Sequence, residues 1–231
     1  MMREHALLPR KAAKWMTFGQ IARALARNRS GIMLVEFAYA IPFMMLIASN
    51  GLELANWVMV RRRLGDMASM TADNASRIGT DSVLANLRIT EADINQVLLG
   101  TRLSSGTMNI QTNGRIILSS LQRNADGGQW IAWQRCTGAV SVASAYGPQG
   151  TGVTGTSLLG MGPSGQRVAA TAGTAIMFVE LTYRYKAIVP VATYDFGDVK
   201  EEASFNIRDN RELSATNNPA NPAPAAAAST C

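Results

Sequence analysis

One long apolar stretch, residues 32–60, constrains this chain more than any other feature. A helix over these residues rises about 1.5 Å per residue and is roughly 43 Å long, which exceeds a hydrocarbon core of about 30 Å. Its uninterrupted apolar part, residues 37–49, covers only about 20 Å. Residues 32–60 therefore predict a transmembrane helix, which Pro42 is expected to kink or to open locally.

Polar residues interrupt the second half of this stretch at a regular spacing. Asn50, Glu53 and Asn56 recur every third residue, so they share one face of a helix. Such a face is poorly suited to lipid. We expect it to meet neighbouring subunits, or to belong to turns that rise out of the bilayer.

A short junction precedes the apolar stretch. Residues 27–31 read Arg-Asn-Arg-Ser-Gly, and Glu36 follows five residues after Gly31. Ionisable side chains inside membrane segments are costly to bury and usually mark functional positions. Glu36 is therefore a candidate functional residue.

The net charge of the chain comes from its first segment. Residues 1–31 hold seven basic side chains and one acidic side chain, and they account for the whole formal net charge of +6. The neutral remainder argues against a nucleic-acid-binding domain, because such domains spread basic residues over their folded surface. We therefore expect no nucleic-acid partner.

Basic residues also predict the orientation of the helix, because they concentrate on the cytoplasmic side of membrane segments. Seven of them precede the apolar stretch, and only Arg61, Arg62 and Arg63 follow it closely. The N-terminus is therefore predicted to be cytoplasmic and the C-terminal part to be exported, with membrane lipid around the helix.

Residue types that carry catalysis or bind metals are scarce after residue 31. The only histidine is His5, which excludes histidine-dependent triads and histidine metal sites from residues 32–231. Four acids could provide the acid–base pair of a hydrolase: Glu180, Asp195, Asp198 and Glu201. Surface acids balanced by basic neighbours are the commoner explanation. We predict no catalytic residue, no metal site, no cofactor and no enzymatic activity.

The two cysteines are Cys136 and Cys231, the last residue of the sequence. An even pair in a domain outside the cytoplasm is interpreted as a disulfide, which would contribute roughly 4 kcal/mol by closing a long loop. The alternative is two unrelated thiols. Their spacing does not match that of metal ligands.

The organisation of the chain is indicated by these patterns. The helical pattern continues beyond the apolar stretch to Gly79, a stop signal, and Thr90 is the expected cap of a second helix at 91–99. The predicted segments are a basic leader (1–31), a transmembrane helix (32–60), a helix extension (61–80), an exported α+β domain (81–216) and a Pro/Ala-rich tail (217–231). The tail is expected to be flexible, and tethered if Cys231 is bonded.

The exported domain is predicted to contain antiparallel strands. Asn113-Gly114 is a strong hairpin signal, and Thr137-Gly138 is a second turn signal. The expected pairs are 107–111 with 115–120 and 129–136 with 139–145, and further strands are expected at 175–185 and 205–208. Residues 147–165 are rich in Gly, Ser and Thr and predict a long loop. The fold class is thus α+β, a long N-terminal membrane-spanning helix followed by a small exported domain.

These motifs together resemble a known family. Ser30-Gly31-Ile-Met-Leu-Val-Glu36-Phe37-Ala38, then Pro42 and Gly51-Leu-Glu53-Leu, are similar to the start of TadE-like pseudopilins, minor subunits of the tight-adherence (Flp/Tad) pilus. Two later motifs, Arg62-Arg63-Leu and Ala72-Asp73-Asn-Ala-Ser-Arg77, resemble the segment after the anchor in that family. The specific resemblance covers residues 30–79.

The resemblance implies a processing site and an assembly residue. A prepilin peptidase is expected to cleave between Gly31 and Ile32, and Glu36 to attract the free amine of an adjoining subunit. Phe37 stands where major pilins of this system more often carry Tyr, which favours a minor subunit. The implied partners are the peptidase, other pilins or pseudopilins, and the inner-membrane assembly platform of the pilus. The implied location is the bacterial inner membrane, with a periplasmic C-terminal domain and association with the pilus.

Two other interpretations use the same residues. The chain could be a single-pass envelope protein that keeps its leader and uses the exported domain as a binding module. A conventional secretory signal peptide is the second alternative, but the residues after 49 show no small-x-small cleavage site.

Overall fold

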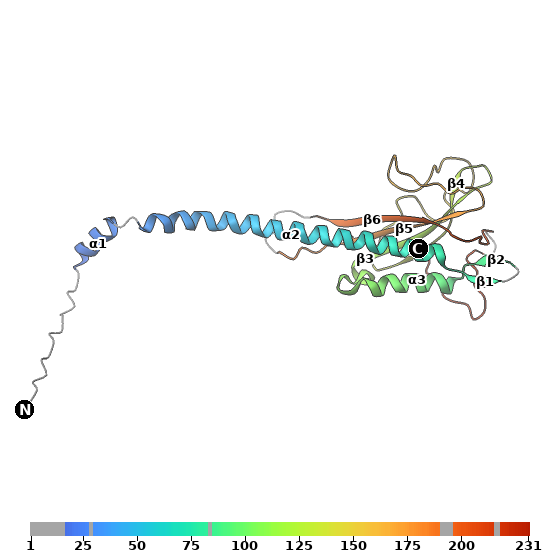
Figure 1. Cartoon of the computed structure of the whole chain (residues 1–231), viewed down its shortest axis with the longest axis horizontal. Helices are drawn as coiled ribbons and strands as arrows, with labels where there is room; N and C mark the ends of the chain where they lie inside the picture. Colours follow the sequence, from blue (N-terminus) through green and yellow to red (C-terminus); the bar gives the residue numbers. More distant parts are fainter. Residues whose placement is uncertain (1–16, 28–29, 83–84, 190–195, 215–217) are drawn as a thin grey trace, which may run out of the picture. The chain divides into compact units, whose positions relative to one another are not determined.

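The computed structural model describes residues 17–27, 30–82, 85–189, 196–214 and 218–231, which include both a helical and a mixed α/β part (Figure 1). The chain divides into two compact units, Met1–Ser49 and Asn50–Cys231. The helices are α1 (Phe18–Arg27), α2 (Ser30–Arg77), α3 (Glu91–Ser104), the 3₁₀ helix η1 (Gly106–Met108) and α4 (Ile110–Asn113). The strands are β1 (Thr80–Ser82), β2 (Ala85–Arg88), β3 (Gly114–Arg123), β4 (Gln129–Thr137), β5 (Ala175–Arg184) and β6 (Asp198–Asn206).

Helix α2 confirms the expected single long apolar helix and its extension. Among the described residues it is the one helix long and apolar enough to cross a membrane by length and composition. Pro42 lies inside it, and the expected kink stays a prediction. Residues 31–48 are exposed without exception, whereas Glu53 has the first buried side chain among the residues of α2 from Gly31 onward.

The second half of α2 packs through small and apolar side chains at helical spacing. Leu64, Ala68, Ala72 and Ala75 are completely buried, and such a stripe turns one helix face toward a core. Thr71 lies between them and its hydroxyl is 2.7 Å from that of Thr101 in α3. This contact joins the two helices side by side.

Helix α3 begins where its cap was predicted. The Thr90 hydroxyl accepts a hydrogen bond from the Asp93 backbone N–H (3.1 Å), and the Asp93 carboxylate accepts one from the Thr90 N–H (3.0 Å). These reciprocal bonds satisfy two N–H groups that a helix start leaves unpaired. The helix ends at Ser104, later than the predicted residue 99.

Four antiparallel strands form the sheet, in the order β4-β3-β5-β6. The side chains of α2, α3 and one sheet face share a core that includes Ile116, Trp133 and Met177. A second cluster on the opposite sheet face joins Leu121, Ile131 and Phe178 to the long loop. The helices thus cover one face of the sheet and the loop covers part of the other, which is a two-layer α+β arrangement.

The predicted hairpin around Asn113-Gly114 is wrong, because residues 107–111 form no strand. They belong to η1 and α4, which are joined by Asn109 in the left-handed region (φ 46°). Gly114 is extended (φ −144°) and begins β3 instead of turning. A type I′ turn needs positive φ at both central residues. Complete burial of Ile110 within the helical turn outweighs that local preference.

The predicted pairing of 129–136 with 139–145 is also wrong. Strand β4 forms as expected but pairs with β3, which has β5 on its other edge. Gly138 (φ +107°) brings the backbone against the carbonyl oxygen of Gly114, where a side chain would collide. The chain then leaves β4, since the Ala139 N–H donates to the carbonyl of Gln111 (2.9 Å).

The long loop 147–165 is confirmed as a segment without helix or strand, apart from a bridge between Met161 and Val168. It covers the outer edge of β4, because the Ile131 N–H donates to Thr151 (2.9 Å) and the Gly150 N–H donates to Ile131 (2.8 Å). Strand β5 lies at the predicted residues, whereas β6 begins at Asp198, before the predicted 205–208. The pair β1–β2 was not predicted.

The C-terminal strap, residues 218–231, is bonded well before Cys231. Its Ala220 N–H donates to the carbonyl of Ile89 (2.8 Å) and its Ala220 carbonyl accepts from the N–H of Glu91 (2.9 Å). Near its end, the Ser229 carbonyl accepts from the N–H of Cys136 (2.7 Å). The strap therefore connects the start of α3 with the end of β4.

Candidate assembly site

The residues of the predicted processing site lie in the first turns of α2. Ile32 and Phe37 are 56% and 64% exposed, and a Cβ placed on Gly31 would meet no atom within 4 Å. Glu36 is also exposed, and the described part of the chain provides no hydrogen bond or ion pair to its carboxylate. Helical spacing places Ile32 and Glu36 on one face. The site is therefore open on all sides.

The surface around this site is apolar along its whole length. Twelve large apolar side chains between residues 32 and 47 are at least 40% exposed: Ile32, Met33, Leu34, Val35, Phe37, Tyr39, Ile41, Phe43, Met44, Met45, Leu46 and Ile47. Monomers in water rarely expose a contiguous apolar patch of this kind, which marks contact with lipid or protein.

Glu53 occupies a buried niche that the sequence did not predict. Its side chain is 1% exposed and its carboxylate accepts hydrogen bonds from the Tyr185 hydroxyl and from the N–H groups of Ile188 (3.0 Å) and Val189 (2.9 Å). Asn56 donates to the same Tyr185 oxygen (2.7 Å). Burial, and then the bond to Glu53, raise the pKa of the Tyr185 phenol. The three-residue spacing of Glu53 and Asn56 was the sequence signal for a polar site on α2. Their hydrogen-bond partners could not be predicted, because they lie more than a hundred residues further along the chain.

A second unpredicted feature is a buried ion pair between α3 and β4. Arg135 and Glu91 are 9% and 5% exposed at their side chains, and the Arg135 Nε lies 2.9 Å from a Glu91 carboxylate oxygen. Arg135 Nη1 also donates to Gln149 (3.0 Å) and to the Gln134 carbonyl (2.8 Å). A charged residue inside a buried strand was the sequence signal for this pair.

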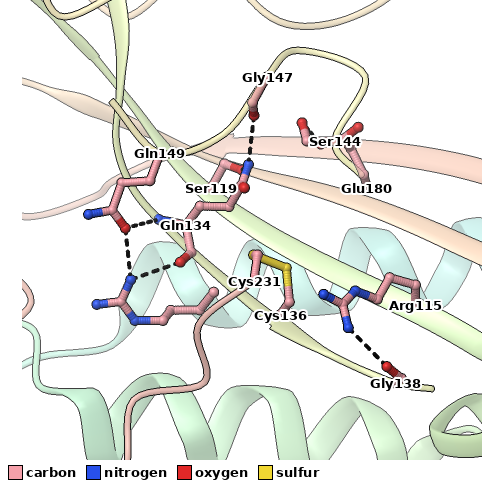
Figure 2. The surroundings of a disulfide bond; sticks show 11 residues. Arg115, Ser119, Gln134, Cys136, Gly138, Ser144, Gly147, Gln149, Glu180 and Cys231 are labelled. Atoms are coloured by element: carbon pink, nitrogen blue, oxygen red, sulfur yellow. Dashed lines mark hydrogen bonds between the residues drawn. A yellow bond between two sulfur atoms is a disulfide. The ribbon is translucent and has the colours of Figure 1, made fainter. Parts of the chain in front are cut away.

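The predicted disulfide between Cys136 and Cys231 is present. Figure 2 shows it between Gln134 and Arg115, beneath the turn that carries Ser144 and Gly147. Cys231 and its neighbours Arg115, Gln134, Ser144 and Gly147 line a pocket of about 400 Å³. Arg115 donates to the Gly138 carbonyl (3.0 Å). The pocket combines polar and apolar walls, and the hydroxyl of Ser144 in its lining donates to the Glu180 carboxylate.

The three acids of the hydrolase alternative that the structure describes, Glu180, Asp198 and Glu201, do not form an acid–base pair. Glu180 lies on the loop-covered sheet face, where its carboxylate accepts from the Ser144 hydroxyl (2.5 Å) and the Ala145 N–H (2.7 Å), and burial raises its pKa. Glu201 points to the helix face and pairs with Arg61 (2.7 Å). Asp198 is 4.0 Å from Arg184, and Asp195 lies outside the described residues.

Metal and cofactor ligands do not gather in the part of the chain that the structure describes, where no group of three or more His, Cys, Asp or Glu side chains could hold a metal ion.

Comparison with known proteins adds no relative: no family model, curated protein or solved structure matches the chain. Any function must therefore be inferred from its own residues.

Proposed function

We propose that this protein is a TadE-like minor pseudopilin that takes part in assembly of a tight-adherence (Flp/Tad) pilus in the bacterial inner membrane. The observation that carries the proposal is the junction from Gly31 to Glu36 at the start of a helix whose apolar side chains are all exposed over residues 32–47. The exposed surface has the composition of a membrane span. Glu36, the one charged residue between positions 32 and 47, is the proposed assembly residue.

The proposed mechanism begins with cleavage by a prepilin peptidase between Gly31 and Ile32. Cleavage removes the basic leader and creates a new amine at Ile32. Apolar helices then pack side by side, and Glu36 of one subunit attracts the amine of its neighbour. A carboxylate in a low-dielectric environment stays ionised when such a cation is close, so the pair sets the register between subunits. The protein acts structurally, by initiating, capping or priming the filament, and not as an enzyme.

Charge and cysteine chemistry support the proposed orientation. The basic leader favours a cytoplasmic N-terminus. Disulfides form and persist in oxidising compartments such as the periplasm, which agrees with an exported domain that carries the Cys136–Cys231 bond.

Replacing Gly31 by leucine is expected to abolish cleavage, so that the protein keeps its leader and migrates as a heavier species. The bulky side chain would block the peptidase, while the helix itself has open space at this position. The measurement is mass spectrometry of the N-terminus of protein purified from native membranes.

Gly19→Leu is the matched control, because Gly19 is also a helical glycine, and a Cβ placed on it would likewise meet no atom within 4 Å. It should be cut normally. If wild-type protein from its native host still begins at Met1, the pseudopilin proposal fails and the single-pass envelope protein with an uncut leader remains.

Replacing Glu36 by alanine is expected to impair processing or filament assembly while export of the C-terminal domain continues. The variant loses the charge that would pair with the neighbouring amine. The measurements are N-terminal cleavage and recovery of the subunit with sheared filaments. Tyr39→Phe, an exposed neighbour in α2, is the control and should behave as wild type. Normal cleavage and assembly of the Glu36 variant would remove this residue from the mechanism.

A further inference from the structure

The Glu53 niche fixes a short backbone segment against α2. The Glu53 carboxylate accepts hydrogen bonds from the consecutive N–H groups of Ile188 and Val189 and from the Tyr185 hydroxyl. Three donors on one buried carboxylate form charge-assisted bonds, which are stronger than bonds between neutral groups. Residues 185–189 are therefore held at one defined position along the axis of α2, beside Glu53.

This fixed segment carries an apolar side chain that faces solvent in the isolated chain. Ile188 is 57% exposed, although its backbone is bonded to the most buried polar residue in the apolar stretch of α2. Lys186 and Ala187 beside it are exposed as well. The segment thus combines an exposed aliphatic group with an adjacent ammonium.

Aromatic rings surround the niche on the same part of α2. Trp57 stacks on Phe196 with ring centroids 5.2 Å apart, and Tyr185 meets Phe196 edge-on at 6.0 Å. The guanidinium of Arg61 lies 5.5 Å from the Trp57 ring centroid. Trp and Tyr are enriched where a membrane meets water, with basic residues nearby.

The length of the apolar helix places the niche where α2 leaves the bilayer. A hydrocarbon core of about 30 Å takes roughly 20 helical residues. Counted from Ile32 that length ends at Gly51, and counted from Phe37 it ends at Asn56. Glu53 lies within about three residues of both limits, so the segment that it holds is close to the boundary between acyl chains and headgroups for either starting point.

We infer that residues 185–189, locked to α2 by Glu53, are a membrane-contact surface that rests on the outer leaflet face of the anchoring bilayer. Ile188 enters the boundary between headgroups and acyl chains, and the Lys186 ammonium lies among lipid phosphates. This inference rests on the membrane-spanning helix of the proposed function. Lipid is the occupant because Leu52 of α2, next to the niche residue, is apolar and 61% exposed as well.

The test uses a fluorescent NBD label at Ile188→Cys in the full chain, reconstituted into bilayers of phosphatidylcholine and phosphatidylglycerol. Both native cysteines are bonded to each other, so the introduced thiol is the one available for labelling. We expect blue-shifted emission that is quenched more by lipids with a nitroxide on the headgroup than by lipids with a nitroxide deep in the acyl chain.

Two further labels separate this inference from the proposed function. Phe43→Cys reports the centre of the span and should be quenched mainly by the deep nitroxide. Leu159→Cys, which is 65% exposed in the long loop, is the control and should remain in water. Near-UV circular dichroism checks that each labelled variant is folded, and Lys186→Cys repeats the measurement if Ile188→Cys does not fold.

Each outcome decides between the possibilities. A label at 188 that stays in water while the label at 43 is in the bilayer overturns the membrane-contact surface and leaves the anchor intact. A label at 188 that is shielded from water but not quenched by either lipid indicates a protein partner, which also overturns it. A label at 43 that is not in the bilayer removes the membrane anchor and the proposed function with it.

Discussion

Glu91→Ala is expected to lower the free energy of unfolding by about 3–5 kcal/mol, because it leaves the buried Arg135 charge without a partner. The Arg135 guanidinium is 9% exposed and its Nε donates to both Glu91 carboxylate oxygens. Gln149 and the Gln134 carbonyl accept from Nη1 only, so they cannot replace the lost carboxylate. The measurement is urea unfolding of the full chain in non-ionic detergent.

A matched pair of variants tests the cause of this loss. Arg77→Ala removes an exposed ion pair with Asp73, in which Arg77 is 54% exposed, and should cost only about 0–1 kcal/mol. The double variant of Glu91 and Arg135 should be destabilised less than the sum of its two single variants, since no lone buried charge remains. A Glu91→Ala loss as small as that of Arg77→Ala would show that the pair is solvated.

Replacing both Cys136 and Cys231 by serine is expected to cost about 4–5 kcal/mol of unfolding free energy, because the bond closes a loop with a sequence separation of 95 residues. The same change frees the end of the C-terminal strap. Hydrogen exchange should therefore quicken at the N–H of Cys136, which donates to Ser229 in the bonded protein.

The redox dependence of stability provides the control for this prediction. Adding a reductant should destabilise the wild-type chain by the same amount and should leave the serine double variant unchanged. Equal unfolding midpoints for the oxidised wild type and the double variant would mean that the loop closure contributes nothing.

Several elements were predictable because their signals are local. The cap at Thr90 and its partner Asp93 lie three residues apart, and α3 begins there. The Thr137-Gly138 turn signal placed the end of β4, and β5 lies in the strand predicted at 175–185. The proposed processing site is equally local, since Gly31 and Glu36 are separated by less than two helical turns.

The wrong assignments came from places where distant contacts override a local preference. Asn113-Gly114 is a hairpin signal, yet Ile110 is buried in the core and α4 forms instead. Residues 139–145 had strand character, but both edges of β3 are taken by β4 and β5, and the loop and strap cover β4. Sequence patterns do not specify whether the edge of a strand is already paired with another strand or covered by a loop.

The sequence by itself determined the long apolar helix, the basic segment before it and the position of Glu36, because charge and hydropathy along a helix act between near neighbours. It also limited the cysteines to one possible pair. Only the tertiary structure decided that Glu53 binds Tyr185 and the backbone at 188–189, and that Glu91 meets Arg135. These groups are far apart in the chain, and a buried charge acquires its partner only when the packing of α2 and α3 on the sheet excludes water from both.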